Sequence, residues 1–343
     1  MAALSTPVQR GVSFVHSWEG RGEKGYGSEA SRRSLAELRA LGTTWISVMP
    51  FGFLPSLSAD SIRLPDDGAG PGRLLRRSAG ESDERIRRQI ADAHALGIQV
   101  LLKPHLWIGG GAWCGEINPG TPERWTRFFA SYERLLLHYA ELAQSAGADM
   151  LAVGVELCST TAQFADRWHE LITKTRALYT GKLVYAANWD EVGRVPFWDA
   201  LDFIGVQFYA PLAEAPDAPD AILAQRLSGH LDTIEQVALR TRRPVLFTEV
   251  GYKSIRATAV QPHLWPEHLS RSALEVSDAA QAQAYRVFFS GIRSRGWVAG
   301  VYVWKWFSDP ESQEEDATGF SPRGKPAEAV LRAAFSPAGT SPR

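Results

Sequence analysis

Two glutamates occupy equivalent places in two apolar stretches of the 343-residue chain. Glu156 follows the apolar run in residues 149–158, and Glu249 follows the apolar run in residues 244–252. Such runs, bounded by glycine and small polar residues, are typical of strands buried on both faces of a parallel sheet. A buried carboxylate without partners costs several kcal/mol, so we expect both side chains to face a cavity with partners. Two carboxyl groups in one cavity can act as a general acid or base and as a nucleophile.

Six further apolar runs have the length and the bounds of strands. With the two glutamate runs, the expected strands lie in residues 11–15, 44–49, 98–103, 149–158, 182–188, 203–209, 244–252 and 300–304. Helix signals separate most of these strands. The start signals are Ser28, Ser82 and Thr121 followed by Pro122, and the stop signals are Gly42, Gly97 and Gly147. The alternation of strand and helix predicts an α/β protein.

Eight consecutive strand–helix units are most simply closed into a single (β/α)8 TIM barrel. We place this barrel at residues 11–335, between an N-terminal tail of residues 1–10 and a C-terminal tail of residues 336–343. The links from helix to strand are short, as at residues 42–43 and 180–181, whereas several links from strand to helix are long. Long loops therefore gather at the carboxyl ends of the strands, which form the catalytic face of this fold.

Residues at or just past the strand ends share one rim of such a barrel. The candidate substrate-binding residues on this rim are His16, Trp18, Lys103, His105, Trp107, Asn188, Gln207, Tyr209 and Trp304. Carboxyl groups for a glycosidic bond, polar groups for hydroxyls and aromatic faces for the C–H side of a ring suit a sugar. We therefore expect a polysaccharide or oligosaccharide substrate. The histidines and cysteines lack metal-type spacing, so we expect neither a metal nor a cofactor.

The strand-end motifs resemble those of clan A glycoside hydrolases, and most closely those of glycoside hydrolase family 113, the β-mannanases. The motifs are Gly-Val-Ser-Phe at 11–14, Lys-Pro-His at 103–105, Gly-x-Glu ending at Glu156 and Thr-Glu-x-Gly-Tyr around Glu249. Their order over about residues 11–335 carries the resemblance, rather than any single motif. The resemblance implies a retaining endo-hydrolase of β-1,4-linked mannan-type chains. It also implies that Glu156 is the general acid/base and Glu249 the nucleophile.

The residue before Glu156 departs from the clan pattern. Most clan A enzymes place an asparagine there to hold the sugar 2-hydroxyl, whereas this chain has Val155. Either Asn188 or another donor on the rim makes that contact, or this protein handles the hydroxyl differently. The departure bears on the subsites and on the identity of the sugar more than on the reaction.

The expected mechanism is a double displacement by the two glutamates. An apolar strand end and the negative charge of Glu249 keep Glu156 protonated, so that it can protonate the leaving oxygen. Tyr209 is the expected hydrogen-bond donor to Glu249, and Trp304 is the expected platform under the sugar. Retention requires the carboxyl groups to lie about 5–5.5 Å apart, whereas a gap of about 6.5–9.5 Å would indicate inversion.

Three other functions stay open on the residues alone. The first is a carbohydrate-binding barrel that has lost catalysis, in view of Val155. The second is a transglycosidase, or a hydrolase of another β-linked hexose polymer, that uses the same two glutamates. The third is a barrel lyase or aldolase that uses Lys103 as a Schiff base. Within the glycosidase interpretation, Lys103 and His105 either orient Glu156 or contact the substrate directly.

Charge and hydropathy argue against several classes of partner. The formal net charge is -1 and no strong basic stripe is present, so we expect no nucleic acid. No 18-residue apolar run is present, so we expect no membrane span. Residues 1–10 lack the charged and apolar regions of a signal peptide, so we expect a cytoplasmic monomer, with a processed secreted form left open. Cys114 and Cys158 fall on loops at one end of the barrel, and two free thiols are expected rather than a disulfide.

Overall fold

A computed structural model of the protein describes most of the chain. The described residues are 8–19, 23–64, 81–265, 269–270 and 274–336. The expected tails lie largely outside them, because residues 1–7 and 337–343 are not described. The first strand begins at Gln9, just before the expected start of the barrel.

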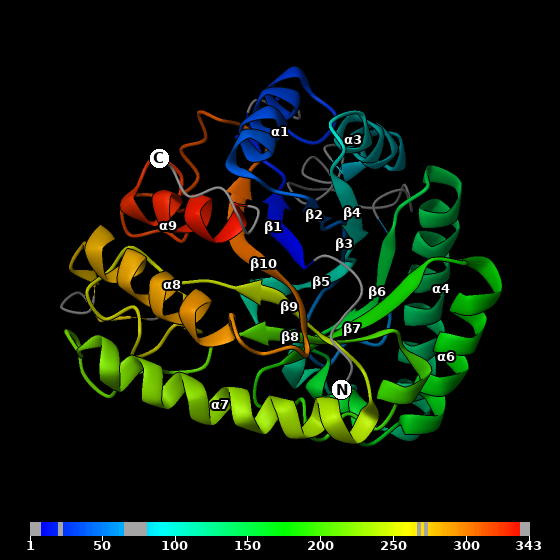
Figure 1. Ribbon diagram of the computed structural model, residues 1–343. Coiled ribbons are helices and arrows are strands. Elements are labelled where there is room, and N and C mark those ends of the chain that lie inside the picture. The colour runs from blue at the N-terminus through cyan, green and yellow to red at the C-terminus, as the bar shows by residue number, and fades with distance from the viewer. Residues whose placement is uncertain (1–7, 20–22, 65–80, 266–268, 271–273, 337–343) are drawn as a thin grey trace.

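Eight parallel strands close into a barrel (Figure 1). In order around the barrel they are β1 (Gln9–Val15), β2 (Trp45–Val48), β4 (Gln99–Leu102), β6 (Met150–Val155), β7 (Lys182–Asn188), β8 (Phe203–Phe208), β9 (Val245–Val250) and β10 (Val298–Phe307). Every strand pairs in parallel with both neighbours, and β10 pairs with β1 to close the ring. The predicted (β/α)8 barrel is therefore confirmed, and the carboxyl ends of all eight strands meet at one rim.

The helices around the barrel begin and end largely where the sequence signals predict. They are α1 (Glu29–Leu41), α3 (Asp83–Ala95), α4 (Pro122–Ala146), α6 (Ala165–Leu178), α7 (Asp220–Thr241), α8 (Asp278–Ile292) and α9 (Pro326–Phe335). Ser28, Ser82 and Thr121 each accept a bond from the first helical turn. Between β7 and β8 the chain has the 3₁₀ turn Trp198–Ala200 in place of an α-helix. Within the described ranges, no helix is both long and apolar enough to cross a bilayer.

A second sheet of two strands extends the carboxyl ends of β2 and β4. Its strands, β3 (Phe51–Leu54) and β5 (His105–Ile108), pair in parallel with Phe51 opposite His105. Neither of these strands was predicted from the sequence. Four-residue strands that start beside a proline carry too short an alternation of apolar and polar residues to be recognised. This sheet holds His105 and Trp107 on a regular element directly beyond Lys103.

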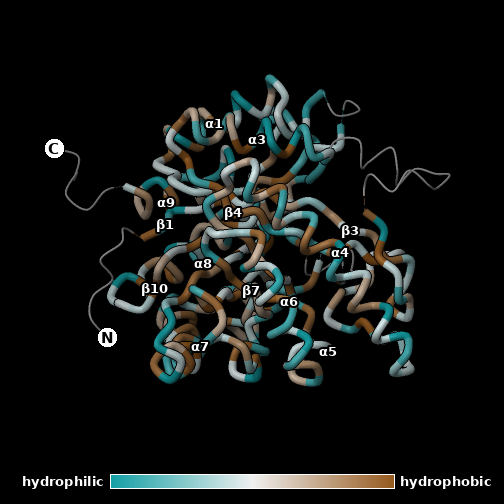
Figure 2. The backbone as a smooth tube through the Cα atoms, turned by 90° about the vertical axis from the view of Figure 1, so that its right-hand side faces the viewer, coloured by the Kyte–Doolittle hydropathy of each residue, from teal (hydrophilic) through white to brown (hydrophobic). Residues whose placement is uncertain are grey.

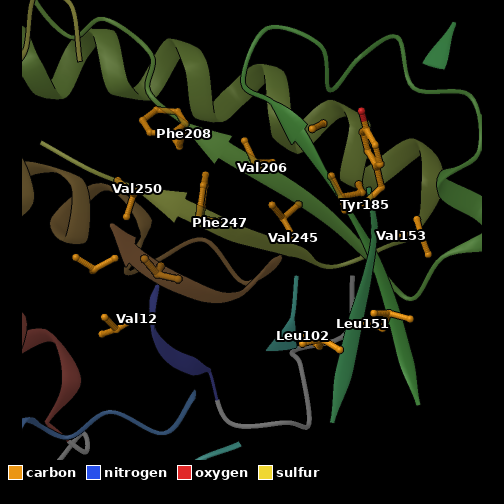
Figure 3. Packing of buried hydrophobic residues seen from close by; sticks show 14 of the residues in the cluster. Val12, Leu102, Leu151, Val153, Tyr185, Val206, Phe208, Val245, Phe247 and Val250 are labelled. Carbon is orange, nitrogen blue, oxygen red and sulfur yellow. The ribbon is translucent and has the colours of Figure 1, made fainter. Parts of the chain in front are cut away.

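The core has two layers, because alternate residues of each strand face the barrel interior and the surrounding helices. The interior cluster consists of Trp45, Leu101, Met150, Ala152, Val184, Leu246, Ala299 and Tyr302. The larger cluster fills the space between strands and helices, and Figure 3 shows part of it, including Leu151 and Phe247. Hydrophobic and hydrophilic segments alternate along the covering helices (Figure 2). The barrel is thus a filled scaffold, and the polar side chains of the next section lie beyond its packed interior.

Candidate active site

Glu249 is held at the end of β9 by two donors. Its carboxyl is 4 % exposed. The ammonium of Lys103 lies 2.5 Å from Oε1, and the phenol of Tyr209 donates to Oε2 at 2.7 Å. Because both partners donate, both oxygens act as acceptors, which is the bonding pattern of a carboxylate. The hydrogen bond predicted from Tyr209 is present.

Lys103 is completely buried at the end of β4. Besides Glu249, its Nζ donates to the backbone oxygen of Thr248 at 3.3 Å. Burial lowers the pKa of Lys103, and the neighbouring charge of Glu249 opposes that shift. The ion pair of Lys103 is with Glu249, and its charge also acts on Glu156.

Glu156 lies one residue beyond β6, and its backbone conformation differs from that of Glu249, which lies within a strand. Its φ is 50°, in the left-handed region that non-glycine residues rarely adopt. Its N–H donates to the oxygen of Ala186 on β7 at 2.8 Å, so the backbone is still tied to the barrel. The side chain is half-buried, and the indole N–H of Trp113 donates to Oε2 at 2.9 Å. The turn thus lifts this carboxyl away from the packed strand and places it beside Trp113.

The electrostatic surroundings raise the pKa of Glu156 to about 7. Burial is the largest cause, and the negative charge of Glu249 is the next. The bond from Trp113 and the positive charge of Lys103 act in the opposite direction. The charge of Glu249 acts on Glu156, so the two carboxyls lie close enough to interact, although they are 93 positions apart in the chain (249 minus 156). Near neutral pH this environment supplies a carboxylic acid beside a carboxylate, the arrangement that separates acid from nucleophile in glycosidases.

His16 and Trp18 lie together just past β1. His16 is 1 % exposed, and its Nδ1 accepts a bond from the N–H of Tyr26 at 3.1 Å. Burial, with a contribution from Arg85, lowers the pKa of His16 to about 3. Its ring centroid lies 4.6 Å from that of Trp18, which is half-buried. His16 is therefore a neutral imidazole whose ring packs against the indole of Trp18.

His105 and Trp107 flank Phe51 in the small sheet. The centroid of the Phe51 ring lies 5.6 Å from that of His105 and 5.8 Å from that of Trp107. Burial and the charge of Lys103 hold the pKa of His105 well below its usual value, so this imidazole is neutral. Among the described residues its Nε2 has no partner, and Trp107 is 41 % exposed. The structure thus places His105 near Lys103 and presents Trp107 to solvent.

Asn188 and Gln207 lie at the ends of neighbouring strands and are bound to their own surroundings. Gln207 is 2 % exposed, stands opposite Glu249 in the strand register and accepts a bond from Thr248 Oγ1 at 3.3 Å. The Oδ1 of Asn188 accepts from the backbone N–H of Trp189 at 3.0 Å, and the side chain is half-buried. Val155 is 6 % exposed, and its apolar side chain has no donor or acceptor to make the contact of the missing asparagine.

Trp304 lies within β10, three residues before its last residue Phe307, and β10 pairs with the nucleophile strand β9. The expected strand end at 304 is therefore too early. The peptide bond between Trp304 and Lys305 is cis. A Cβ at Gly251 would meet Trp304 Cβ and Tyr209 Cε1, each at 3.0 Å. The glycine in Thr-Glu-x-Gly-Tyr therefore lets the indole, the phenol and the β9 end approach closely.

Four residues of this region escaped the sequence analysis. They are Trp113, Glu191, Lys253 and Trp265. Trp113 and Trp265 are 42 % and 46 % exposed, and an exposed tryptophan in a loop is the signal that could have found them. Trp265 lies beside Trp304, with ring centroids 6.5 Å apart. Glu191 and Lys253 are buried charges on loops, and nothing local in the sequence distinguishes them from solvated residues.

Lys253 and the two cysteines make local bonds behind the rim. Lys253 donates to the backbone oxygens of Gln261, Pro262 and Leu264, the loop that leads to Trp265. Both cysteines are free thiols, as expected.

Within the described part of the chain, no three His, Cys, Asp or Glu side chains gather as metal ligands would.

Comparison with known proteins identifies the family of the barrel. The model of Glycoside Hydrolase Family 113 matches residues 14–325. A search of curated protein sequences gave no match.

Solved structures of family 113 enzymes are similar to this chain over nearly its whole length. A complex of a family 113 β-1,4-mannanase has a TM-score of 0.80 and 26% identity, covering 96% of this chain and 99% of that chain. The family 113 β-mannanase from Alicyclobacillus acidocaldarius, in complex with ManMIm, has a TM-score of 0.80 and 27% identity, covering 97% and 99%. A family 5 mannosidase from Rhizomucor miehei shares the fold, with a TM-score of 0.63 and 11% identity, covering 96% and 92%. The chain therefore belongs to Glycoside Hydrolase Family 113.

Proposed function

We propose that this protein is a retaining β-1,4-mannanase that uses Glu156 as general acid/base and Glu249 as nucleophile. The observation that carries the proposal is the contrast between two carboxyls on one rim. Glu249 is bonded to an ammonium and a phenol, while burial and the charge of Glu249 raise the pKa of Glu156 to about 7. The solved family 113 structures at 26% and 27% identity, both called mannanases, support the substrate class.

In the first step Glu249 attacks the anomeric carbon of the sugar. A bond forms between that carbon and a carboxylate oxygen of Glu249, while the bond to the glycosidic oxygen breaks. Glu156 transfers its proton to the departing oxygen, so the leaving chain departs as a neutral alcohol. Lys103 and Tyr209 hold Glu249 in a single orientation during the attack, because each is bonded to one of its oxygens.

In the second step water releases the sugar. Glu249 carries no negative charge while it is esterified, so the charge that raised the pKa of Glu156 is gone. The pKa of Glu156 then falls, and the ionised carboxylate takes a proton from water. The water oxygen bonds to the anomeric carbon as the ester bond breaks, and two inversions give net retention.

Four indoles are our candidates for contacts with the sugars of the substrate. Trp304 and its neighbour Trp265 lie beside the nucleophile strand, and they suit the sugar that becomes esterified. Trp113 bonds to the acid/base, which acts on the leaving oxygen, so Trp113 and the exposed Trp107 suit the leaving part of the chain. Aromatic faces on both sides of the cleaved bond would favour a polymer over a single small sugar.

The environment of Lys103 disfavours the lyase or aldolase alternative. A Schiff base needs a neutral amine that a carbonyl substrate can reach. The Nζ of Lys103 is instead fully buried and bonded to Glu249 and to the Thr248 oxygen.

Digestion of mannan by the wild type beside Glu156→Ala and Glu249→Gln tests the proposal. We expect the wild type to release manno-oligosaccharides and Glu249→Gln to release none above background. Proton NMR of the first product should show the β-anomer, because retention preserves the configuration of the cleaved bond.

Three results would contradict the proposal in different ways. A first product of α configuration would indicate inversion. Sugar binding without turnover by the wild type would favour the carbohydrate-binding barrel. Cleavage of another β-linked hexose polymer in preference to mannan, or transfer products in place of hydrolysis, would favour the remaining alternatives.

A further inference from the structure

The turn that carries Glu156 is held by side chains in addition to its backbone bond to Ala186 on β7. Glu156 has a left-handed φ of 50°, and the short helix α5 (Cys158–Thr161) begins two residues later. The N–H of Leu157, between them, donates to the phenol oxygen of Tyr185 on β7 at 2.9 Å. A non-glycine residue persists in this conformation only where its surroundings determine it. The support of Tyr185 and α5 is therefore part of what aims the Glu156 carboxyl.

A third buried carboxyl, that of Glu191, connects these supports. Glu191 lies in the loop after β7 and is 1 % exposed. It accepts bonds from Thr161 Oγ1 at 2.5 Å and from Cys158 Sγ at 3.1 Å, both in α5. It also accepts from the Tyr185 phenol at 3.4 Å and from the N–H of Asn188 at 3.3 Å. One carboxyl thus joins α5, β7 and the loop after β7.

Burial raises the pKa of Glu191, and the hydrogen bonds that its carboxyl accepts oppose that shift. The number of these donors indicates that Glu191 acts as a carboxylate. An ionised carboxyl offers about four acceptor sites and no donor, whereas a protonated carboxyl or an amide must give up at least one. Four donors converge on Glu191, and Tyr185 can donate to it while accepting from Leu157. Glutamine at 191 would turn an N–H₂ group toward groups that already donate.

We propose that Glu191 is a positioning residue for the acid/base: its carboxylate fixes Tyr185 and α5, and these hold the turn that presents Glu156. This inference rests on the proposed role of Glu156. Glu191 is 1 % exposed, and its side-chain bonds go to Thr161, Cys158, Tyr185 and Asn188 rather than to Glu249 or Glu156, so it acts through the turn and through its charge.

The charge of Glu191 belongs to a small set that faces Glu156. Glu249 on β9 and Glu191 after β7 raise the pKa of Glu156, while Lys103 on β4 and the Trp113 indole lower it. On its other sides, Glu191 faces the titratable groups of Cys158 and Tyr185. Replacing Glu191 with a neutral residue should therefore lower the pKa of Glu156. A residue that only stabilised the loop would not move that pKa.

The test compares Glu191→Gln with two matched variants. Glu170→Gln removes the same charge from an exposed position on α6. Tyr185→Phe removes the hydroxyl that links Leu157 to Glu191 without changing any charge. We expect kcat on manno-oligosaccharides to fall about 10- to 100-fold in Glu191→Gln and less in Tyr185→Phe, because a small displacement of a catalytic group has effects of this size. Glu170→Gln should match the wild type.

The NMR signal of the Trp113 indole N–H provides a second readout that needs no activity. This N–H bonds to Glu156, so its shift should follow the titration of Glu156, with a midpoint near pH 7 in the wild type. The midpoint should move to lower pH in Glu191→Gln and stay in place in Tyr185→Phe and Glu170→Gln. Trp113→Phe identifies the signal.

The outcomes separate this inference from the proposed function. Wild-type kcat and an unmoved midpoint in a folded Glu191→Gln would overturn the inference. If Glu191→Gln does not fold, Tyr185→Phe decides, and unchanged kcat there would overturn it. If the wild type does not cleave mannan, the proposed function fails, but the midpoint still shows whether Glu191 acts on Glu156.

Discussion

The two glutamate strands look alike in sequence and end in different surroundings. Glu249 lies within β9, with regular strand geometry, and is 4 % exposed. Its two oxygens bond to an ammonium and a phenol. Glu156 lies just beyond β6 in a left-handed turn, is half-buried and bonds to a single neutral indole. The backbone position relative to the strand end thus decides how deeply each carboxyl is set.

This difference indicates how one rim can hold an acid and a nucleophile at the same pH. A cation in contact favours the charged form of a carboxyl, whereas burial and a nearby negative charge favour the neutral form. Lys103 is in contact with Glu249, and Glu249 is in turn the negative neighbour of Glu156. The charge states of the two glutamates are therefore coupled. A substitution that changes the charge of Glu249 should change the pKa of Glu156.

The largest expected effect comes from removing the nucleophile. Glu249→Gln keeps the shape of the side chain but cannot attack the anomeric carbon, so kcat on mannan should fall by about 10⁴-fold or more. Glu170→Gln, an exposed change of the same type, is the control. Residual activity of the variant within tenfold of the wild type would contradict the assignment of Glu249.

Removing the acid/base should have an effect that depends on the leaving group. Glu156→Ala should lower kcat on mannan by about 10²- to 10⁴-fold, because the departing oxygen of a sugar needs a proton. A β-mannoside with a dinitrophenolate leaving group needs no proton, so its glycosylation step should be nearly unaffected. Stopped-flow measurement of phenolate release checks this, and an equal loss on both substrates would argue against the acid role.

The two donors to Glu249 should differ in their contribution to stability. Lys103→Met leaves a buried carboxylate without its cation, and the free energy of unfolding should fall by about 3–5 kcal/mol. Tyr209→Phe removes one bond to a charged group, and the loss should be about 1.5–3 kcal/mol. Urea unfolding at pH 7 measures both values. If the tyrosine variant lost more stability than the lysine variant, the ion pair would not be the dominant support of Glu249.

The smallest expected effect is a shift in the pH dependence of kcat/KM when a neighbour of Glu156 is replaced. The bond from Trp113 lowers the pKa of Glu156, so Trp113→Phe should raise that pKa. Activity that needs protonated Glu156 is lost as pH rises through its pKa, near 7 in the wild type. The alkaline limb of the kcat/KM profile should therefore move to higher pH in Trp113→Phe. Trp107→Phe is the matched control, and a limb that moves to lower pH would contradict the contact.

Much of the scaffold could be predicted because its signals are local. Ser28 and Ser82 accept bonds from residues a few positions ahead, and Gly42 ends a helix by its own backbone conformation. The apolar runs that predict the strands are also local, and eight of them in alternation with helices leave few folds to choose from. The β3–β5 sheet escaped because each strand has only four residues and its partner is distant in sequence.

The site could be predicted only in part, for a related physical reason. Glu156 and Glu249 are marked by their strand ends, and Tyr209 was found because its strand precedes β9. No sequence signal distinguishes Glu191, because an acidic residue in a loop is usually solvated. Only the fold places four donors around its carboxyl.

The sequence by itself determined which strands the barrel has and that a glutamate stands at the ends of β6 and β9, because strand length, burial and capping depend on near neighbours. Only the tertiary structure decided which partners each carboxyl meets. Lys103 bonds to Glu249 across 146 positions, and Trp113 bonds to Glu156 across 43. Charge state depends on groups within a few ångströms, and closure of the barrel is what sets those distances.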